Sequence, residues 1–503
     1  MTEPPETPQV SARDPRIGVD EWTARSDERI HRYEGLTGHV RRRLDGIPVA
    51  VRFGVLAGGA ALVPALTSDQ YVLRVGVVSL IYALLALGLN VSVGLAGLLD
   101  LGYVAFYGFG AYGYAMLSSA KFGVHWPTWG SLLVVLAASV LVGFLLALPS
   151  RRLVGDYLAI VTLFFGQIFY TVAVQGYRVP LITIQGSHDL TGGPNGIADV
   201  DGFRFFGHAL ATNRAYFWAA LIAVVAVFAA MHLMNQSRTG RAWRALRDDP
   251  LATELMGMPV NWLKLLAIAV GAGAGALAGT INVASLGGAF PDDYNTPILI
   301  TIYAMVILGG VGSLTGVVVG AVSVNVLLEV LRTPEHARWI LYAAILLGLA
   351  AKLRPWRRLA VVLAGTAAFG IALHAIVAAA WPRGVHGLVS ISGTDFSTGG
   401  WLGWALRHWL VLPANTYEAG RYTAFNVGLV LLIGLVLALT LVRGLLRWLL
   451  LVPTLWLAAL VWETRLVEEG AGPTRFLLLG AILVVLMAAR PQGLFGTHRV
   501  EIV

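Results

Sequence analysis

The chain has no cysteine and only a few lysines. None of its 503 residues is a cysteine, which excludes disulfides, thiolate metal sites and cysteine nucleophiles. The only lysines are Lys121, Lys264 and Lys352, and none of them follows a glycine. A Walker-type phosphate loop needs a Gly-Lys pair, so this chain cannot form one. If the protein works with ATP, another chain must hydrolyse it.

Charged residues are also scarce. They make up 13% of the chain, against roughly 25% in an average soluble domain, while apolar residues make up 57%. This composition excludes a disordered chain and argues against a soluble enzyme, which leaves a polytopic membrane protein. The net charge of +8 comes mainly from arginines clustered between apolar runs. That arrangement indicates membrane topology and gives no support for nucleic-acid binding.

The apolar runs predict an all-α fold, a polytopic transmembrane helical bundle of about 12–14 spans. A bilayer-spanning helix needs about 20 apolar residues. Two runs, 297–309 and 339–351, are shorter than this. The 14 candidate spans are 49–66, 72–92, 103–119, 130–149, 157–176, 214–234, 262–284, 297–309, 314–331, 339–351, 359–380, 425–442, 446–462 and 475–489.

Charge bias predicts the orientation of these spans. Arginine clusters near residues 41–43, 151–152, 238–247, 352–358 and 490–499 fall on one side of the span count. The acidic residues Glu463, Glu468, Glu469, Asp292 and Asp293 fall on the other side, in stretches interpreted as loops and turns. By the positive-inside rule, both termini are expected in the cytoplasm, with long outside loops at 177–213 and 381–424.

Few ionisable residues lie inside the predicted spans. Glu329 is interpreted as reaching the headgroups, and His374 as a hydrogen-bonded helix contact. A relay of buried carboxylates, which many proton-coupled carriers use, is missing. An ion-coupled secondary transporter is therefore less favoured, although some carriers bind ions with backbone carbonyls and helix ends.

Glycines mark close contacts between helices. Gly271, Gly275 and Gly279 repeat every four residues, and so do Gly312, Gly316 and Gly320. This spacing places each set on one helix face, where two backbones can approach closely. The stripes predict tight packing and do not indicate a substrate.

The junction of the second and third spans is unusually polar. Asn90, Ser92 and Asp100 lie there with Gly94 and Gly97, and they are the candidates for the translocation pathway. Non-helical backbone is tolerated at membrane depth only where protein or water covers it. The segment is either a pore-lining re-entrant turn or a cramped helix corner, and residue chemistry alone favours neither.

A short docking helix is predicted in the loop 235–261. Asp249 is a good N-cap, Pro250 suits the first helical position, and Gly257 can end the helix in a left-handed conformation. Leu251, Leu255 and Met256 form one apolar side. A short capped helix in a basic cytoplasmic loop is suited to a groove on another protein, and the alternative is a helix lying on the membrane surface.

Several segments of the sequence resemble those of a known family. The segment LGLNVSVGLAGLLDLGYVAFYGFGAY (87–112) resembles the signature of LivM-type permeases, the membrane subunits of branched-chain amino-acid ABC importers. SRTGRAWRALRDDPLATELMGM (237–258) is similar to their cytoplasmic coupling loop, and TGGPNGI (191–197) to an outside motif. MVILGGVGSLTGVVVGA (305–321) and RPQGLFG (490–496) resemble later family segments, in the right order.

The resemblance implies roles for particular residues. Glu254 and Gly257 match the EAA-type coupling motif, and Arg241, Ala242 and Arg247 match the basic approach to it. The residues expected to couple to the ATPase are Arg241, Ala242, Arg247, Asp249, Pro250, Glu254 and Gly257. The outside motif contributes Gly192, Gly193, Asn195 and Gly196. No catalytic residue, metal or cofactor is expected on this chain.

The resemblance also implies partners and a location. We expect a second permease subunit, two ATPase subunits that bind ATP, an extracytoplasmic substrate-binding protein and the lipid bilayer, and no nucleic acid. The membrane would be a bacterial-type inner membrane. Branched-chain amino acids are the default substrate of the family. The alternative is a permease for urea or short-chain amides. An ion-coupled carrier is less favoured because no convincing coupling-ion site is found, and a membrane enzyme is less favoured because no HExxH or GxSxG occurs.

The C-terminal part departs from the family pattern, in which RPQGLFG closely follows the last core span. LAAKLRPWRRL (349–359) resembles LMAARPQGLFG (486–496), as if that span occurred twice. Trp401, Trp404 and Trp409 suggest an interfacial helix with aromatic anchors at the headgroups. The predicted division is a polar tail 1–48, a permease core 49–358 with the coupling loop 235–261, added spans 359–489 with the outside loop 381–424, and a C-terminal tail 490–503.

Overall fold

The computed structural model describes most of the chain from residue 48 onward. The described residues are 48–150, 156–176, 189–205, 208–332, 334–353, 356–380, 405–406, 408–411, 423–442, 444–468 and a few between 475 and 493. They form two compact units, one of residues 1–321 with 492–503 and one of residues 322–491. The predicted polar tail 1–48 and the span 475–489 lie largely outside the described residues, and so does most of the loop 381–424.

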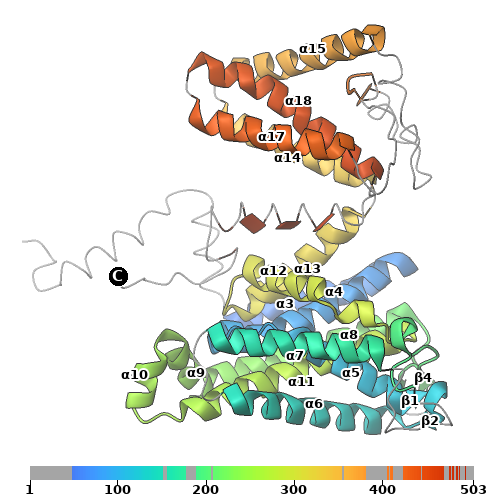
Figure 1. Ribbon diagram of the computed structural model, residues 1–503. Helices are drawn as coiled ribbons and strands as arrows, with labels where there is room; N and C mark the ends of the chain where they lie inside the picture. Colours follow the sequence, from blue (N-terminus) through green and yellow to red (C-terminus); the bar gives the residue numbers. More distant parts are fainter. Residues whose placement is uncertain are drawn as a thin grey trace, which may run out of the picture. The chain divides into compact units, whose positions relative to one another are not determined.

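The predicted all-α fold is confirmed. Apolar runs become helices because a helix satisfies every backbone polar group within its own segment, which a bilayer demands. The long helices of the first unit are α3 (Val49–Leu66), α4 (Gln70–Leu89), α5 (Tyr103–Leu117), α6 (Thr128–Ser150), α7 (Asp156–Gln175), α8 (Asn213–Gln236), α11 (Val260–Leu286), α12 (Thr296–Gly309) and α13 (Leu314–Val330), whose C-terminal part belongs to the second unit (Figure 1).

Within the described residues, eight helices are long and apolar enough to cross a membrane. α12 has 14 residues, as short as expected. At 1.5 Å per residue it covers about 21 Å, less than the hydrocarbon core of about 30 Å. The run 339–351 belongs to α14 (Pro334–Lys352), which at 19 residues is longer than expected. The apolar part of α14 is Arg338–Ala350.

Helix α11 forms the centre of the first unit. It packs against α4, α5 and α6, and with α5, α6 and α7 it forms a set of roughly aligned helices (Figure 1). Its glycine stripe makes the tight contacts expected from the spacing. A Cβ on Gly279 would overlap the carbonyl oxygen of Tyr107 and lie 2.8 Å from the backbone nitrogen of Ala111. A Cβ on Gly275 would lie 3.3 Å from Phe106.

The second glycine stripe is only partly as predicted. Gly320 packs α13 against α12, since a Cβ there would lie 2.7 Å from the Cα of Gly309. Gly312, however, is not on the helix, because α13 begins two residues later. It sits in a turn with a φ of +89°, a left-handed conformation that favours glycine. The prediction of a helical stripe at Gly312 was therefore wrong.

Short strands connect the helices at one end of the first unit. β1 (Ser118–Ser119) pairs antiparallel with β2 (Val124–His125), and β3 (Arg204–Phe205) pairs antiparallel with β4 (His208–Ala209). The registers join Ser118 to His125 and Arg204 to Ala209. Three short helices lie between the longer elements, namely η2 (Ala120–Phe122), η3 (Gly193–Asn195) and η4 (Pro291–Tyr294).

The second unit contains α14 with α15 (Trp356–Ala380), α17 (Thr423–Leu441) and α18 (Leu445–Glu468). α18 packs against α15 and α17 (Figure 1). A buried ion pair joins α14 to α18: Arg338 Nε donates to both carboxylate oxygens of Glu463, at 3.0 and 2.9 Å. Tyr342 donates its hydroxyl to the same carboxylate at 2.9 Å. The prediction that Glu463 lies in an acidic loop was therefore wrong, since α18 extends to Glu468.

Part of the tryptophan-rich segment packs against α15. Trp409 lies against α15 and donates from Nε1 to the carbonyl oxygen of Ala367 at 3.1 Å. Trp409, Leu410 and Val411 pack into the apolar core of the second unit, where Leu410 is fully buried. Trp401 and Trp404 lie outside the described residues. His374 is hydrogen-bonded as expected, with Nδ1 2.8 Å from the carbonyl oxygen of Leu410.

Candidate functional site

A helix pair lies in the loop that the sequence marks for docking. α9 (Arg238–Asp248) follows α8 after Ser237, whose hydroxyl caps it, and α10 (Pro250–Leu255) follows α9 after Asp249. Trp243 fixes α9 to the bundle: its ring is fully buried, and Nε1 donates to the carbonyl oxygen of Leu263 on α11 at 2.9 Å. α9 is thus anchored to α11 and positions α10.

The capping of α10 agrees with its sequence. The Asp249 carboxylate accepts from the backbone N–H groups of Leu251 and Ala252, at 2.8 and 3.0 Å. Pro250 occupies the first turn, where its missing N–H costs nothing. Gly257 has a φ of +78°, and its N–H donates to the carbonyl oxygen of Glu254 at 2.9 Å. These residues fix a helix of six residues with defined ends.

The apolar side of α10 is uncovered in this chain. Leu251 is 67% exposed, Leu255 79% and Met256 81%, and Glu254 on the same helix is also exposed. Thr253, the buried residue of α10, faces inward and donates its hydroxyl to the carbonyl oxygen of Asp249 at 2.7 Å. Three adjacent large apolar side chains on a polar loop mark a surface for interaction with another molecule.

The basic approach to α10 divides into two groups. Arg241 donates to the carbonyl oxygen of Gln236 at 3.1 Å and Arg244 to Asn235 Oδ1 at 2.8 Å, so both fold back onto the end of α8. Ala242 is half-buried between them in sequence. Arg247 points elsewhere: its Nη1 donates to the carbonyl oxygen of Gly94, in the polar segment between α4 and α5. Sequence resemblance grouped Arg241 with Arg247, whereas their side chains have partners in different segments.

That polar segment is an interrupted helix. α4 continues into η1 (Asn90–Leu95), a π-helical turn in which the N–H of Ala96 donates to the carbonyl oxygen of Val91 at 3.0 Å. Such turns are rare and are frequent at functional sites. Asn90 joins η1 to a distant turn, since its Oδ1 accepts from the backbone N–H of Gly312 at 2.9 Å. Asn90, Ser92 and Gly94 are all buried. In this chain the segment is a close-packed corner.

Several polar atoms at this corner have no hydrogen-bond partner within the described residues. They include Asn90 Nδ2, Ser92 Oγ, Asp100 Oδ2 and Tyr103 Oη. Asp100 is otherwise held in place: Oδ1 accepts from the N–H of Gly102 at 3.1 Å, and its carbonyl accepts from the hydroxyl of Tyr303 at 2.7 Å. A buried polar atom without a partner is costly, so this arrangement is less stable than a fully paired core.

Glycines surround the Arg247 side chain. A Cβ on Gly312 would lie 2.6 Å from Nη1, and a Cβ on Gly97 would lie 2.9 Å from Cγ. Both glycines have positive φ, at +89° and +71°. A Cβ on Gly94 would collide with the side chain of Asn90. We call Gly94, Gly97 and Gly312 the glycine collar.

The terminal motif reaches the same region. Gly493 is buried with a φ of +75°, and a Cβ there would overlap the carbonyl oxygen of Ile307 and lie 2.8 Å from the Cα of Gly310. Ile307 and Gly310 lie at the C-terminal end of α12, directly before the turn that holds Gly312. Residues 492–503 accordingly belong to the first unit.

The predicted outside motif forms a compact turn. Gly192, Gly193 and Gly196 all have positive φ, at +78°, +58° and +66°, and Asn195 ends the short helix η3. Ile197 pairs with Ala289 through two backbone hydrogen bonds of 2.9 and 2.8 Å. The motif is thereby fixed to the connection between α11 and η4.

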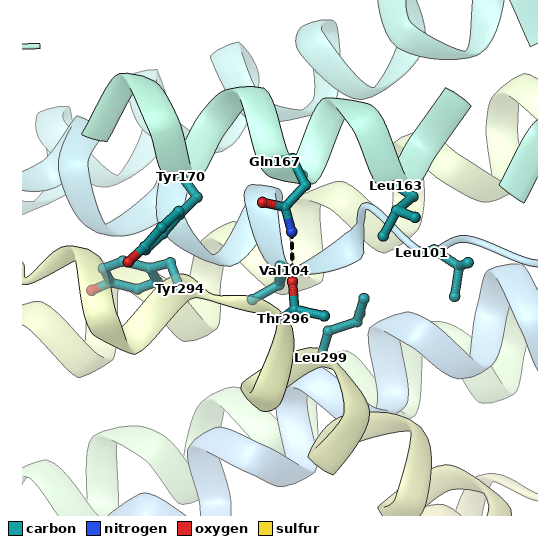
Figure 2. A pocket seen from close by; sticks show the side chains of 9 residues that line it. Leu101, Val104, Leu163, Gln167, Tyr170, Tyr294, Thr296 and Leu299 are labelled. Atoms are coloured by element: carbon teal, nitrogen blue, oxygen red, sulfur yellow. Dashed lines mark hydrogen bonds between the residues drawn. The ribbon is translucent and has the colours of Figure 1, made fainter. Parts of the chain in front are cut away.

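A small polar pocket opens between α7 and the start of α12. Figure 2 shows Gln167 of α7 donating to Thr296 Oγ1, at 2.7 Å. Tyr170 lies one turn further along α7, with its hydroxyl 3.4 Å from Asp292. The lining residues are Leu101, Val104, Leu163, Gly166, Gln167, Tyr170, Tyr294, Thr296 and Leu299. The cavity holds about 10 Å³, room for about one water, so it is no substrate site in this conformation.

The acidic turn beside this pocket is partly desolvated. Burial raises the pKa of the Asp293 carboxyl above its ordinary value, and repulsion from Asp292 adds to the effect. Within the described residues, no three His, Asp or Glu side chains are grouped so that they could hold a metal ion.

The eight apolar helices long enough to cross a membrane define, by their length and composition, a multi-pass membrane protein among the described residues. The family described as "branched-chain amino acid transport system / permease component" matches residues 71–347. The chain belongs to this family.

Individual relatives agree with this assignment. The high-affinity branched-chain amino acid transport system permease protein LivM of Salmonella typhimurium is 35% identical over 281 residues, covering 51% of this chain and 63% of that protein. LivM of Escherichia coli is 34% identical over the same shares. LivH of Salmonella typhimurium is 24% identical over 253 residues, covering 49% of this chain and 80% of that protein. The chain thus spans a little under two thirds of its LivM relatives. No solved structure matches it.

Sequence reasoning missed the contacts that assemble this region. Gly312 and Gly493 were recognised as parts of motifs, yet their partners were not. Arg247 and Gly94 are separated by 153 positions, and Gly312 and Asn90 by 222. The one signal in the sequence for these contacts is glycine outside the predicted helices, because a glycine there indicates a positive φ or a close approach of another segment.

Proposed function

We propose that this chain is the transmembrane permease subunit of an ATP-driven importer for branched-chain amino acids. It would form half of the translocation pathway and bind separate ATPase subunits through α10. The exposed apolar side of α10, Leu251, Leu255 and Met256, is the observation that carries this proposal. A helix of six residues is marginally stable by itself, so the caps at its two ends are what hold these apolar side chains in one arrangement.

The relatives support the choice of substrate and of one partner. LivM and LivH are both named as permease proteins of a branched-chain amino acid transport system, and this chain is similar to both. We propose a LivH-like chain as the second permease subunit. An extracytoplasmic binding protein would approach the end of the bundle that carries the motif with Gly192, Gly193, Asn195 and Gly196. Both termini would be cytoplasmic, in a bacterial-type inner membrane.

The translocation pathway would run beside η1. Asn90, Ser92, Gly94, Gly97 and Asp100 supply the polar groups that a solute needs inside the bilayer. In the present conformation Asn90, Ser92 and Asp100 each have a buried side-chain atom without a hydrogen-bond partner among the described residues. We propose that they become accessible when the bundle rearranges during transport.

The added spans 359–489 would then be an insertion between the permease core and its terminal motif. Gly493 supports this division, because it packs against the end of α12 in the first unit. The chain continues through α15, α17 and α18 before it returns to this place.

A binding experiment tests the proposal. Leu255→Asp places a charge on the side of α10 that would enter a groove of the ATPase, whereas Arg238→Gln changes an exposed residue at the start of α9. We expect the first variant to lose ATPase subunits on purification of the complex and the second to retain them. If Leu255→Asp retains the ATPase at the level of the unaltered chain, α10 is not the docking helix.

A further inference from the structure

Arg247 links the helix pair of the loop to the interrupted helix. It stands at the end of α9, two residues before the cap of α10, and its side chain is half-buried. Its guanidinium donates to the carbonyl oxygen of Gly94 in η1. Gly94 lies in the last turn of η1, where backbone carbonyls have no partner within the helix, so a charged donor there stabilises one arrangement of η1.

The glycine collar is shaped for this side chain. Gly97 and Gly312 come from segments more than 200 positions apart, and a Cβ on either would intrude on Arg247. Both have positive φ, so the backbone is held where other residues would be strained. Close packing of two helices alone does not explain these glycines, since neither lies within a helix. The space that they leave is filled by Arg247.

The far end of the link is a buried segment in which two polar side-chain atoms are unpaired among the described residues. Asn90 Nδ2 and Ser92 Oγ of η1 are buried and have no partner in the described part of the chain. Asn90 Oδ1 accepts from Gly312, a member of the same collar. Displacement of Arg247 therefore alters the surroundings of Gly94 and Gly312 together. A polar segment that is poorly paired in one arrangement can gain partners in another, as a two-state element requires.

The near end of the link is short. Trp243 holds α9 against α11, and only Asp249 separates α9 from α10. A movement of α10 is therefore passed to α9 and Arg247 through a single intervening residue.

We propose that Arg247 is a positioning residue that transmits movement of α10 to η1 by holding the carbonyl of Gly94 within the glycine collar. This inference rests on the proposed ATP-driven function. It assigns Arg247 a role inside the permease, whereas the sequence resemblance places it among residues that meet the ATPase.

Paired arginine variants test the proposal in proteoliposomes that hold the complete complex. Arg247→Gln removes the charged donor, Arg247→Lys keeps a positive donor without the planar fork, and Arg244→Gln is the control on the same helix. The readout is the amount of leucine taken up per ATP hydrolysed. We expect Arg247→Gln to lower this ratio about tenfold or more, the size expected for one charged hydrogen bond, with ATPase subunits still bound. Arg247→Lys should recover part of the ratio, and Arg244→Gln should leave it unchanged.

A spectroscopic readout separates transmission from simple stability. The chain has no cysteine, so Leu99→Cys and Leu286→Cys can carry the only two spin labels on this subunit, at residues 42% and 43% exposed. We expect ATP to change the distance between the labels in the otherwise unaltered chain. The change should be absent when Arg247→Gln is added, although the complex remains assembled.

The outcomes are distinguishable. An unchanged uptake ratio in Arg247→Gln, or an ATP-induced distance change that persists in it, overturns the inference and leaves the proposed function standing. Loss of bound ATPase in Arg247→Gln also overturns it, since Arg247 would then belong to the docking surface. If the unaltered complex shows no uptake that depends on ATP, the proposed function fails and the inference fails with it.

Discussion

Gly257 ends α10 in a conformation that few other residues adopt. Its φ is +78°, and apart from its own chain neighbours no atom lies within 4 Å of the place where a Cβ would stand. A larger side chain therefore meets no steric obstacle, and the cost is in the backbone alone. For an ordinary L-residue the left-handed conformation costs roughly 1–2 kcal/mol. That corresponds to a change by a factor of about 5–30 in the population of the capped end.

We expect Gly257→Val to lower leucine uptake per ATP by a similar factor while the chain still folds and inserts. Gly257→Asn is the matched control, because asparagine adopts positive φ more readily than most residues. It should retain most of the coupling. Both variants are compared in proteoliposomes with the complete complex, and melting temperature confirms folding. Equal uptake per ATP in the valine variant and the unaltered chain would refute the reasoning, and so would an equal loss in both variants.

The remaining predictions concern stability, measured as thermal unfolding in detergent. Gly279→Ala should lower the free energy of unfolding by about 1–3 kcal/mol, because the new Cβ would collide with the backbone of α5. Gly273→Ala should be nearly neutral, because its Cβ would meet only a methyl group of Val140, at 3.1 Å. Arg338→Met leaves Glu463 buried and uncompensated and should cost about 3–5 kcal/mol, most of which a second change, Glu463→Leu, recovers. Asp293→Asn should raise the melting temperature at pH 7.5, because the raised pKa of Asp293 makes its charged form unfavourable in the fold. That gain should shrink as the pH falls toward 4, where the native carboxyl binds its proton; a gain that grows on acidification would contradict the assignment.

Much of the fold could be predicted because a bilayer imposes simple rules. Apolar runs became helices close to the expected bounds: the run 49–66 coincides with α3, and the run 214–234 lies within α8. The ends of α10 were also predictable, since capping depends on side chains a few positions apart, as at Asp249 and Gly257. These features are local, and local chemistry can be read directly from the order of residues.

The errors have a common physical cause, which is that a partner lies far away in the sequence. Glu463 lies in an acidic stretch that is typical of a loop. Arg338, which is 125 positions earlier in the chain, neutralises it between two helices. Nothing near Trp409 in the sequence indicates that its indole N–H donates to a carbonyl oxygen on α15, 42 positions away. Gly312 fits a helical stripe by spacing, but its conformation is determined by its neighbours in the collar.

The candidate site was predicted in pieces and without its connections. The polar residues near Asn90 and the coupling loop with Arg247 were both identified from their composition and motifs. Nothing in either segment indicates that one hydrogen bond joins them, because the donor and acceptor are an ordinary arginine and a backbone carbonyl. The tertiary structure supplies this link.

The most direct test of the account is uptake of labelled leucine by proteoliposomes that hold this chain, a LivH-like permease, ATPase subunits and a binding protein. Vesicles without ATP are the control, and labelled urea is measured in parallel. The account predicts leucine uptake that requires ATP and that excess unlabelled isoleucine or valine reduces. ATP-dependent uptake of urea alone would contradict the substrate, and uptake driven by an ion gradient without ATPase subunits would contradict the mechanism.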